Sequence, residues 1–132
     1  MVVPEMPISM RGKENDYRSI DVGVLSIDRD MEAKRQRLVD GAPEIVIEVL
    51  SPSNTAGEIA DRKRFCLQNG AEVFMVVDPA EQDVTVTYRS DPARRLQYAP
   101  GSSVPIRAFG VETELRVDAI FEGIADAEQS AT

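Results

Sequence analysis

Three charged side chains stand where apolar residues are expected, and together they could carry out hydrolytic chemistry. The stretch PEIVIEVLSPSN at 43–54 is an apolar run that Glu48 interrupts, although a carboxylate is almost never fully buried without a partner. Asp21 lies in an earlier Val- and Ile-rich segment, and Lys63 lies in the segment that follows Glu48. A buried acidic pair beside a lysine is an arrangement that binds a divalent cation and activates water.

Two strands are expected to carry the carboxylates. Residues 18–26 (RSIDVGVLS) and the apolar run that begins at Ile45 are rich in Val, Ile and Leu, as strands are. The second run has the composition of a strand that is buried on both faces. We therefore expect Asp21 and Glu48 on neighbouring strands of one sheet.

A helix from about 55 to 69 is expected to carry the lysine. Thr55 and Glu58 fit a capping box, and Gly70 can close the helix at its other end. At the helical period Lys63 falls in the middle of an apolar stripe and so faces the sheet. Burying the charge of a lysine there is costly unless a carboxylate or a water-filled cleft lies next to it. An ion pair between Glu48 and Lys63 could therefore account for both charged residues.

Each of the three residues also has an ordinary explanation. Glu48 can point to solvent at a strand end, Lys63 can lay its stem along apolar surface, and Asp21 can cap a loop. For one residue alone that explanation is favoured. For the three together on adjacent elements, the functional interpretation is favoured.

Composition narrows the classes of protein that are compatible with this chain. At 132 residues and 42% hydrophobic, with no apolar run near the length of a membrane helix, we expect one soluble domain spanning 1–132. The absence of histidine excludes Ser-His-Asp catalysis and histidine-ligated metal sites, and the single Cys66 excludes a thiolate cage or an internal disulfide. With no signal peptide visible, we expect a cytoplasmic location. The net charge of −8 argues against broad, sequence-independent binding to nucleic acid.

The rest of the chain supplies the expected surroundings of the site. The predicted elements, in chain order, are an irregular or short-strand lead-in over 1–16, an exposed charged loop over 28–42 with a helical turn near 31–38, a hairpin of 72–78 with 84–89, shorter strands near 96–99 and 104–107, a short helix near 117–124 and a mobile tail over 125–132.

Three segments carry a resemblance to a known family. IDVGVLS at 20–26, the stretch from 40 to 79 that contains EVLSPSN, and VDAIFEG at 117–123 resemble the Uma-two family of restriction endonucleases, a branch of the PD-(D/E)XK nuclease superfamily. Asp21 matches the aspartate of the family's first motif, although Ile20 replaces the proline before it. Glu48 matches the catalytic glutamate, and Leu50 stands where the superfamily usually has a lysine.

The resemblance implies an α/β (α+β) fold with a restriction endonuclease-like mixed sheet and a helix after the central strand. It implies that Asp21 and Glu48 hold Mg²⁺ or Mn²⁺ for hydrolysis of DNA phosphodiester bonds, and that a basic residue of the next helix replaces the lysine. Counting back from Gly70 suggests Arg62 for that residue, whereas the helical period favours Lys63. Weaker candidates are Glu44, on the same strand face as Glu48, and Ser51 and Ser53 in the turn that follows.

The chain also departs from the family pattern, so alternatives stay open. Members usually have an upstream helix and hairpin, which we expect to be missing or incomplete here, and Arg62 could hold a phosphate but could not act as a general base. The alternative function is a catalytically inactive nuclease-fold module for binding or assembly. A third hypothesis, a structural salt bridge between Glu48 and Lys63, predicts no metal affinity. An incomplete sheet would leave edges exposed, so a homodimer is expected.

Overall fold

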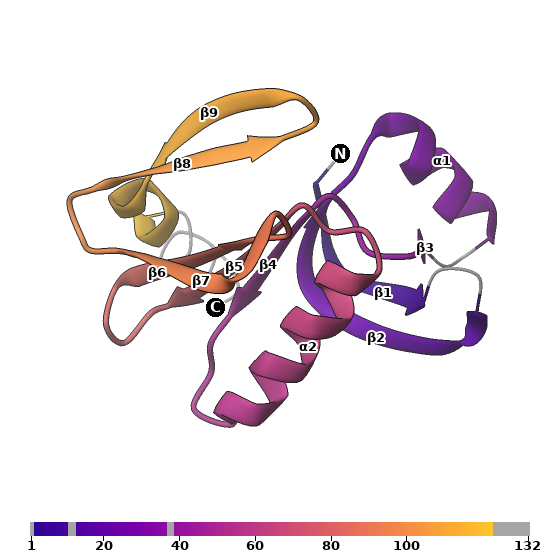
Figure 1. The fold of residues 1–132 in the computed structure, drawn as a ribbon, viewed down its shortest axis with the longest axis horizontal. Helices are drawn as coiled ribbons and strands as arrows, with labels where there is room; N and C mark the ends of the chain where they lie inside the picture. The colour runs from indigo at the N-terminus through magenta and orange to yellow at the C-terminus, as the bar shows by residue number, and fades with distance from the viewer. Residues whose placement is uncertain (1, 11–12, 37–38, 123–132) are drawn as a thin grey trace.

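A mixed sheet of seven strands forms the centre of the molecule (Figure 1). The computed structural model describes residues 2–10, 13–36 and 39–122. Its strands and helices, in chain order, are β1 (Val2–Met10), β2 (Lys13–Val24), α1 (Ile27–Gln36), β3 (Val39–Asp40), β4 (Ile45–Val49), α2 (Ala56–Gln68), β5 (Val73–Asp78), β6 (Asp83–Tyr88), β7 (Asp91–Tyr98), β8 (Ser103–Ala108) and β9 (Val111–Arg116). Residues 117–122 are helical.

The order of the strands places β4 in the middle of the sheet. The order is β3-β1-β2-β4-β5-β6-β7, with β8 and β9 paired in a separate two-stranded sheet. β4 is antiparallel to β2 and parallel to β5, and α2 provides the crossover that a parallel pair requires. The predicted mixed α+β fold with a helix after the central strand is therefore confirmed.

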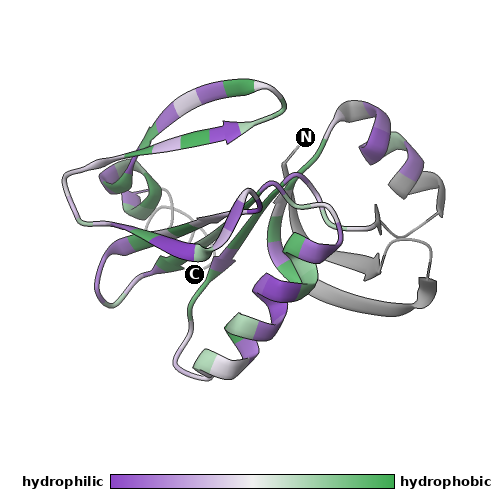
Figure 2. Ribbon diagram, viewed as in Figure 1, coloured by the Kyte–Doolittle hydropathy of each residue, from purple (hydrophilic) through white to green (hydrophobic). Residues whose placement is uncertain are grey.

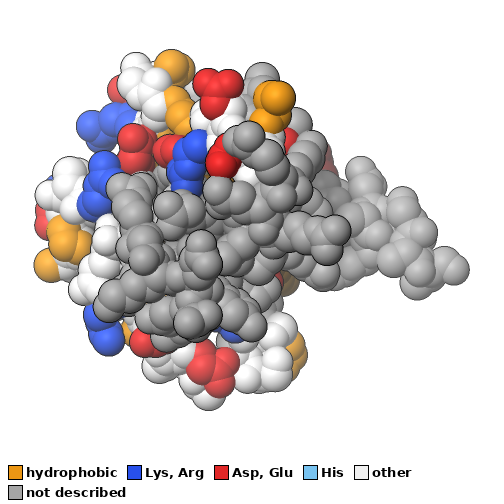
Figure 3. Space-filling view, turned by 90° about the vertical axis from the view of Figure 1, so that its right-hand side faces the viewer, with side chains coloured by type: hydrophobic (Ala, Val, Ile, Leu, Met, Phe, Trp, Pro, Cys, Tyr) orange, Lys and Arg blue, Asp and Glu red, His pale blue; other side chains and the backbone are white. Residues whose placement is uncertain are grey.

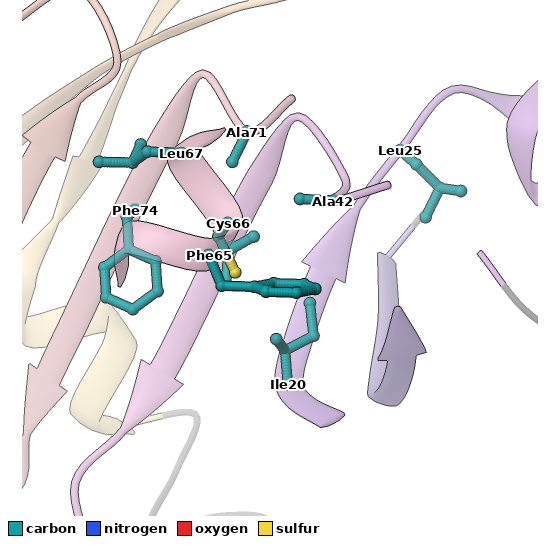
Figure 4. Close-up of a cluster of buried hydrophobic side chains, with 9 residues drawn as sticks. Ile20, Leu25, Ala42, Phe65, Cys66, Leu67, Ala71 and Phe74 are labelled. Atoms are coloured by element: carbon teal, nitrogen blue, oxygen red, sulfur yellow. The ribbon is translucent and has the colours of Figure 1, made fainter. Parts of the chain in front are cut away.

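The two faces of β4 belong to two different cores. Val46 faces α2 and joins a cluster with Ile20, Phe65 and Phe74 (Figure 4). Ile45, Ile47 and Val49 face the other way and pack against a cluster that includes residues of β8. Hydrophobic residues accordingly cover most of β4 and β5, whereas α2 mixes hydrophobic and hydrophilic residues (Figure 2). Glu48 has the same parity as Val46, so the strand period directs it toward α2.

Local signals fix both ends of α2. The Glu58 N–H donates a hydrogen bond to Thr55 Oγ1 at 3.1 Å, which makes Thr55 the N-cap. At the other end Asn69 is the C-cap, and Gly70 follows with φ of 116°, a conformation that glycine adopts without strain. The predicted helix of about 55 to 69 is confirmed to within one residue at each end.

The N-terminal prediction was wrong. In place of an irregular lead-in over 1–16, β1 and β2 form a long antiparallel hairpin, which starts with the pair Val2 and Val24. Of the upstream strand pair that we expected to be missing or incomplete, one strand, β1, precedes the strand β2 that contains Asp21. Pro4 and Pro7 suggested irregular chain, but β1 pairs with β3 only at Ile8 and Ser9, so the outer side of β1 is largely an edge. There the nitrogen of one of the two prolines needs no partner.

The remaining expectations have mixed outcomes. The exposed loop expected over 28–42 is wrong for most of its length, because α1 occupies it, and the helical turn expected near 31–38 overlaps α1 as far as Gln36. The hairpin of 72–78 with 84–89 is confirmed as β5 and β6, and the strands near 96–99 and 104–107 are confirmed as parts of β7 and β8. β9 was not predicted, and the mobile tail expected over 125–132 lies outside the described residues. Within the described chain, no helix is long and apolar enough to cross a membrane.

The N-cap of α2 gives a first prediction about stability. Replacing Thr55 with Ala removes the oxygen that accepts from the Glu58 N–H, and should lower the free energy of unfolding by about 1 kcal/mol. Thr55→Ser keeps the hydroxyl and is the matched control, because it should stay near the wild type. Urea unfolding followed by circular dichroism measures both, and an alanine variant as stable as the serine variant would contradict the assignment of the cap.

Candidate functional site

The glutamate of the apolar run lies fully inside the protein. Glu48 is 0% exposed, on the face of β4 that α2 covers. The register of β2 and β4 pairs Val22 with Ile47. Continuing that register by one residue sets Asp21 opposite Glu48, with both side chains on the same face. Asp21 and Glu48 therefore lie on neighbouring strands of one sheet, as predicted.

A backbone contact holds the Asp21 carboxylate against β4. The Val49 N–H donates a hydrogen bond to Asp21 Oδ2 at 2.8 Å. The bond ties the end of β2 to the residue next to Glu48, and it orients one oxygen of Asp21. Asp21 itself is only partly buried, so the site runs from the interior at Glu48 toward solvent at Asp21.

The positive partner of Glu48 comes from α2, and it is Arg62. Arg62 Nη1 donates to Glu48 Oε2 at 3.2 Å, and the Arg62 side chain is 30% exposed. The pairing of Glu48 with Lys63 that the helical period favoured was wrong. Lys63 does face the sheet as expected, but it lines a groove on the other flank of α2. Counting back from Gly70 had indicated the correct partner.

Negative charge exceeds positive charge at this site. Burial and then the neighbouring Asp21 charge raise the pKa of Glu48 to about 7, although the Arg62 guanidinium lowers it. Cys66 packs nearby, where burial and then the Glu48 charge raise the pKa of its thiol to about 12. Glu48 Oε1 is buried and accepts from no N–H or O–H donor among the described residues, and a hydrogen bond between Glu48 and Asp21 requires a proton on one of the two carboxyls. A cation that replaced this proton would neutralise part of the charge of the pair.

A divalent cation fits this requirement. Mg²⁺ in proteins is commonly bound by one or two carboxylates, with water and substrate phosphate completing its shell. The unpartnered Oε1 of Glu48 and the adjacent Asp21 provide such a pair of carboxylates. In the described part of the chain, no third histidine, cysteine, aspartate or glutamate joins them.

The weaker candidates lie apart from this pair. Glu44 is at the opposite end of β4, where its Oε1 accepts from Arg29 Nη1 at 2.7 Å, so it joins α1 to the sheet. Ser51 and Ser53 lie in the exposed turn after β4 with their hydroxyls 2.9 Å apart, and Ser51 also donates to Asn54 Oδ1. Local contacts therefore account for the two serines and for one oxygen of Glu44, whose Oε2 is buried without a partner among the described residues.

Sequence reasoning missed two members of the site. The backbone N–H of Val49 has no side-chain signature, and only the strand register reveals that it holds Asp21. The proximity of Cys66 to Glu48 was not expected either. One signal was available, since Arg62 stands four residues before Cys66 and therefore shares the buried side of α2.

The buried carboxyl predicts an unusual dependence of stability on pH. Because the pKa of Glu48 is about 7 in the folded chain and 4.5 is the ordinary value, the folded chain keeps a proton that the unfolded chain loses over this range. The free energy of unfolding should therefore fall as pH rises from about 4.5 to about 7, by on the order of 3 kcal/mol.

Glu48→Gln should remove this dependence, because glutamine does not titrate. The measurement is urea unfolding across this pH range in EDTA. Glu112→Gln, at an exposed position on β9, is the control and should behave as the wild type does. Parallel pH profiles for the wild type and Glu48→Gln would show that Glu48 does not hold the proton.

Comparisons with known proteins identify the family. The fold is similar to the crystal structure of a "putative nuclease belonging to DUF820" from Anabaena variabilis, with a TM-score of 0.73, 24% sequence identity, and coverage of 92% of this chain and 67% of that one. At this identity the likeness establishes the fold alone. No curated protein matches the chain. Residues 1–118 match the model of the Uma2 (Uma-two) family, whose description is "Putative restriction endonuclease", and the chain therefore belongs to this family.

Proposed function

We propose that this chain is a metal-dependent endonuclease that hydrolyses a phosphodiester bond of DNA at the Asp21 and Glu48 pair. One observation carries the proposal: a fully buried glutamate, with an oxygen that no donor among the described residues reaches, lies beside a second carboxylate on the central strands of a nuclease-family fold. Glu44 Oε2 is also buried without a partner among the described residues, so the second carboxylate, Asp21, is what distinguishes Glu48.

The chain's own residues would bind the cation and prepare the site. Asp21 and Glu48 would hold Mg²⁺ or Mn²⁺, which when bound supplies Lewis-acid activation of a water and stabilisation of charge on the phosphate. Glu48 must lose its proton to act as a ligand, so cation binding and deprotonation are coupled. The Val49 N–H keeps Asp21 in place during this change.

Arg62 would contribute a fixed positive charge. Arginine stays protonated, so it cannot remove a proton from water. It can hold Glu48 Oε2 in position and offer its remaining N–H groups to a phosphate oxygen, since its side chain is partly exposed. In the overall reaction, water delivers hydroxyl to phosphorus and a proton to the leaving oxygen, and one ester P–O bond breaks.

Metal binding tests the proposal directly. Calorimetry with Mg²⁺ or Mn²⁺ should show binding to the wild type, with Asp21→Asn and Glu48→Gln each weakening it by about tenfold or more. Near pH 6.5 the observed heat should also change with the ionisation enthalpy of the buffer, because Glu48 releases a proton.

Glu44→Gln is the matched control, since Glu44 lies on the same strand but pairs with Arg29. It should bind metal as the wild type does. If a folded wild type binds neither cation, the pair has a structural role, and the inactive-module alternative becomes the better account.

The role of Arg62 can be tested separately by plasmid cleavage. Arg62→Met removes the only guanidinium that contacts Glu48 among the described residues and should lower the cleavage rate by about 10² or more. Arg62→Lys keeps the charge and should retain part of the activity. Arg64→Met removes an exposed charge of the same helix and should cleave normally, so an equal loss in Arg64→Met and Arg62→Met would count against a specific role for Arg62.

A further inference from the structure

A groove with a volume of about 350 Å³ runs along α2 on the side of β5, β6 and β7. Its walls are the first half of α2 and the part of the sheet formed by β5, β6 and β7. Phe74 and Val76 form an apolar floor, and Ile59 and Ala60 form the helix side. Its size falls within the range of about 300–1,000 Å³ that is common for small-molecule sites.

The charge of this groove is opposite to that of the chain. Lys63 from α2 and Arg95 from β7 line it, and no acidic residue does. The whole chain, by contrast, has 23 acidic and 15 basic residues, and acidic and basic side chains lie next to one another among the described residues of the face in Figure 3. The groove therefore offers a local concentration of positive charge to an anion.

Polar side chains also line the groove. Thr85 and Thr87 of β6 lie beside the apolar floor. Thr87 is only 2% exposed, and a threonine hydroxyl can both donate and accept a hydrogen bond. The floor of the groove therefore combines apolar surface with two hydroxyls.

The groove adjoins the carboxylate pair across α2. Leu50 lines it and lies two residues after Glu48, about 7 Å along the chain. On the helix, Arg62 contacts Glu48 while the next residue, Lys63, lines the groove. The two sites are thus reached from adjacent residues of one helix.

We propose that this groove binds one unpaired nucleotide of the nucleic-acid strand whose phosphodiester lies at the Asp21 and Glu48 pair. The apolar floor receives the face of the base, the two threonines meet its polar edge, and Lys63 and Arg95 hold the flanking phosphate. This inference rests on the proposed function for the identity of the strand. It assigns Lys63 to substrate binding and makes single-stranded or distorted DNA the preferred substrate, because a paired base cannot enter a groove between a helix and a sheet.

A second hollow in the molecule is less suited to an anion. Arg89, Arg94 and Arg107 line it near the β6–β7 turn, but Glu72 and Asp91 do so as well. Arg107 is stacked over the Tyr88 ring at 5.5 Å, and Arg89 donates to the Gly70 carbonyl. The acidic neighbours offset two of the three positive charges, whereas the groove beside α2 has no such offset.

Binding of DNA in EDTA tests the inference without metal. The probe is a fluorescein-labelled single strand of about 16 nucleotides, compared with the blunt duplex of the same sequence at about 50 mM salt by fluorescence anisotropy. The wild type should bind the single strand more tightly than the duplex. Lys63→Gln and Arg95→Gln should each weaken single-strand binding by roughly 3- to 10-fold and lower the salt slope by about 0.7. Thr87→Val keeps the charge and shape and should weaken binding by roughly 2- to 5-fold.

Two controls match the charge changes. Arg94→Gln lies next to Arg95 on β7 but lines the other hollow, and Arg64→Gln lies next to Lys63 at an exposed position. Both should bind as the wild type does. The inference is overturned if the wild type does not bind the single strand, if the duplex binds equally well, or if the controls lose as much affinity as the groove variants. Since no cation is present, such a result would leave the metal-binding experiment as an independent measure of the proposed function.

Discussion

The structure depends on how a buried carboxylate in the middle of a sheet is compensated. Glu48 is fully buried on the central strand, and an isolated charge there would be prohibitively costly. The fold reduces this cost in two ways. The Arg62 guanidinium contacts Glu48 Oε2, and a pKa of about 7 keeps the side chain mostly protonated, and therefore uncharged, below neutral pH. Neither way satisfies Oε1, and the adjacent Asp21 adds to the demand for positive charge.

This constraint gives α2 its particular importance. The helix must lie over β4 for Arg62 to contact Glu48, and its caps at Thr55 and Asn69 fix where each turn begins. Consecutive helical residues are about 100° apart, so Arg62 and Lys63 project toward different flanks. A single helix thereby separates the carboxylate pair from the groove and supplies one cation to each. A shift of α2 by one residue would place either Lys63 or Asp61 at the position of Arg62.

The sequence predicted the strand, helix and strand from Ile45 to Asp78 because local signals agree there with the tertiary structure. The prediction of the cation that pairs with Glu48 failed because helical periodicity does not distinguish two consecutive residues well. An apolar helical stripe is at least 100° wide, so it can include both Arg62 and Lys63. Only the packing of α2 against β4 shows which of them contacts Glu48. The N-terminal hairpin was missed because β1 contains two prolines, which edge position permits. The hydrogen bond from Val49 to Asp21 could not be predicted, since it depends on register and not on side-chain type.

The acidic balance of the chain and a nucleic-acid substrate are compatible for a physical reason. A net charge of −8 weakens long-range attraction to DNA, but salt at physiological concentration screens exposed charges beyond about 8 Å. Binding is then decided by the charges nearest to the ligand, and the groove beside α2 places Lys63 and Arg95 there without an acidic neighbour in its lining. A protein of this kind would bind extended duplex poorly and would depend on local fit. Its selectivity would therefore come from strand conformation, which is the property that a groove between a helix and a sheet can discriminate.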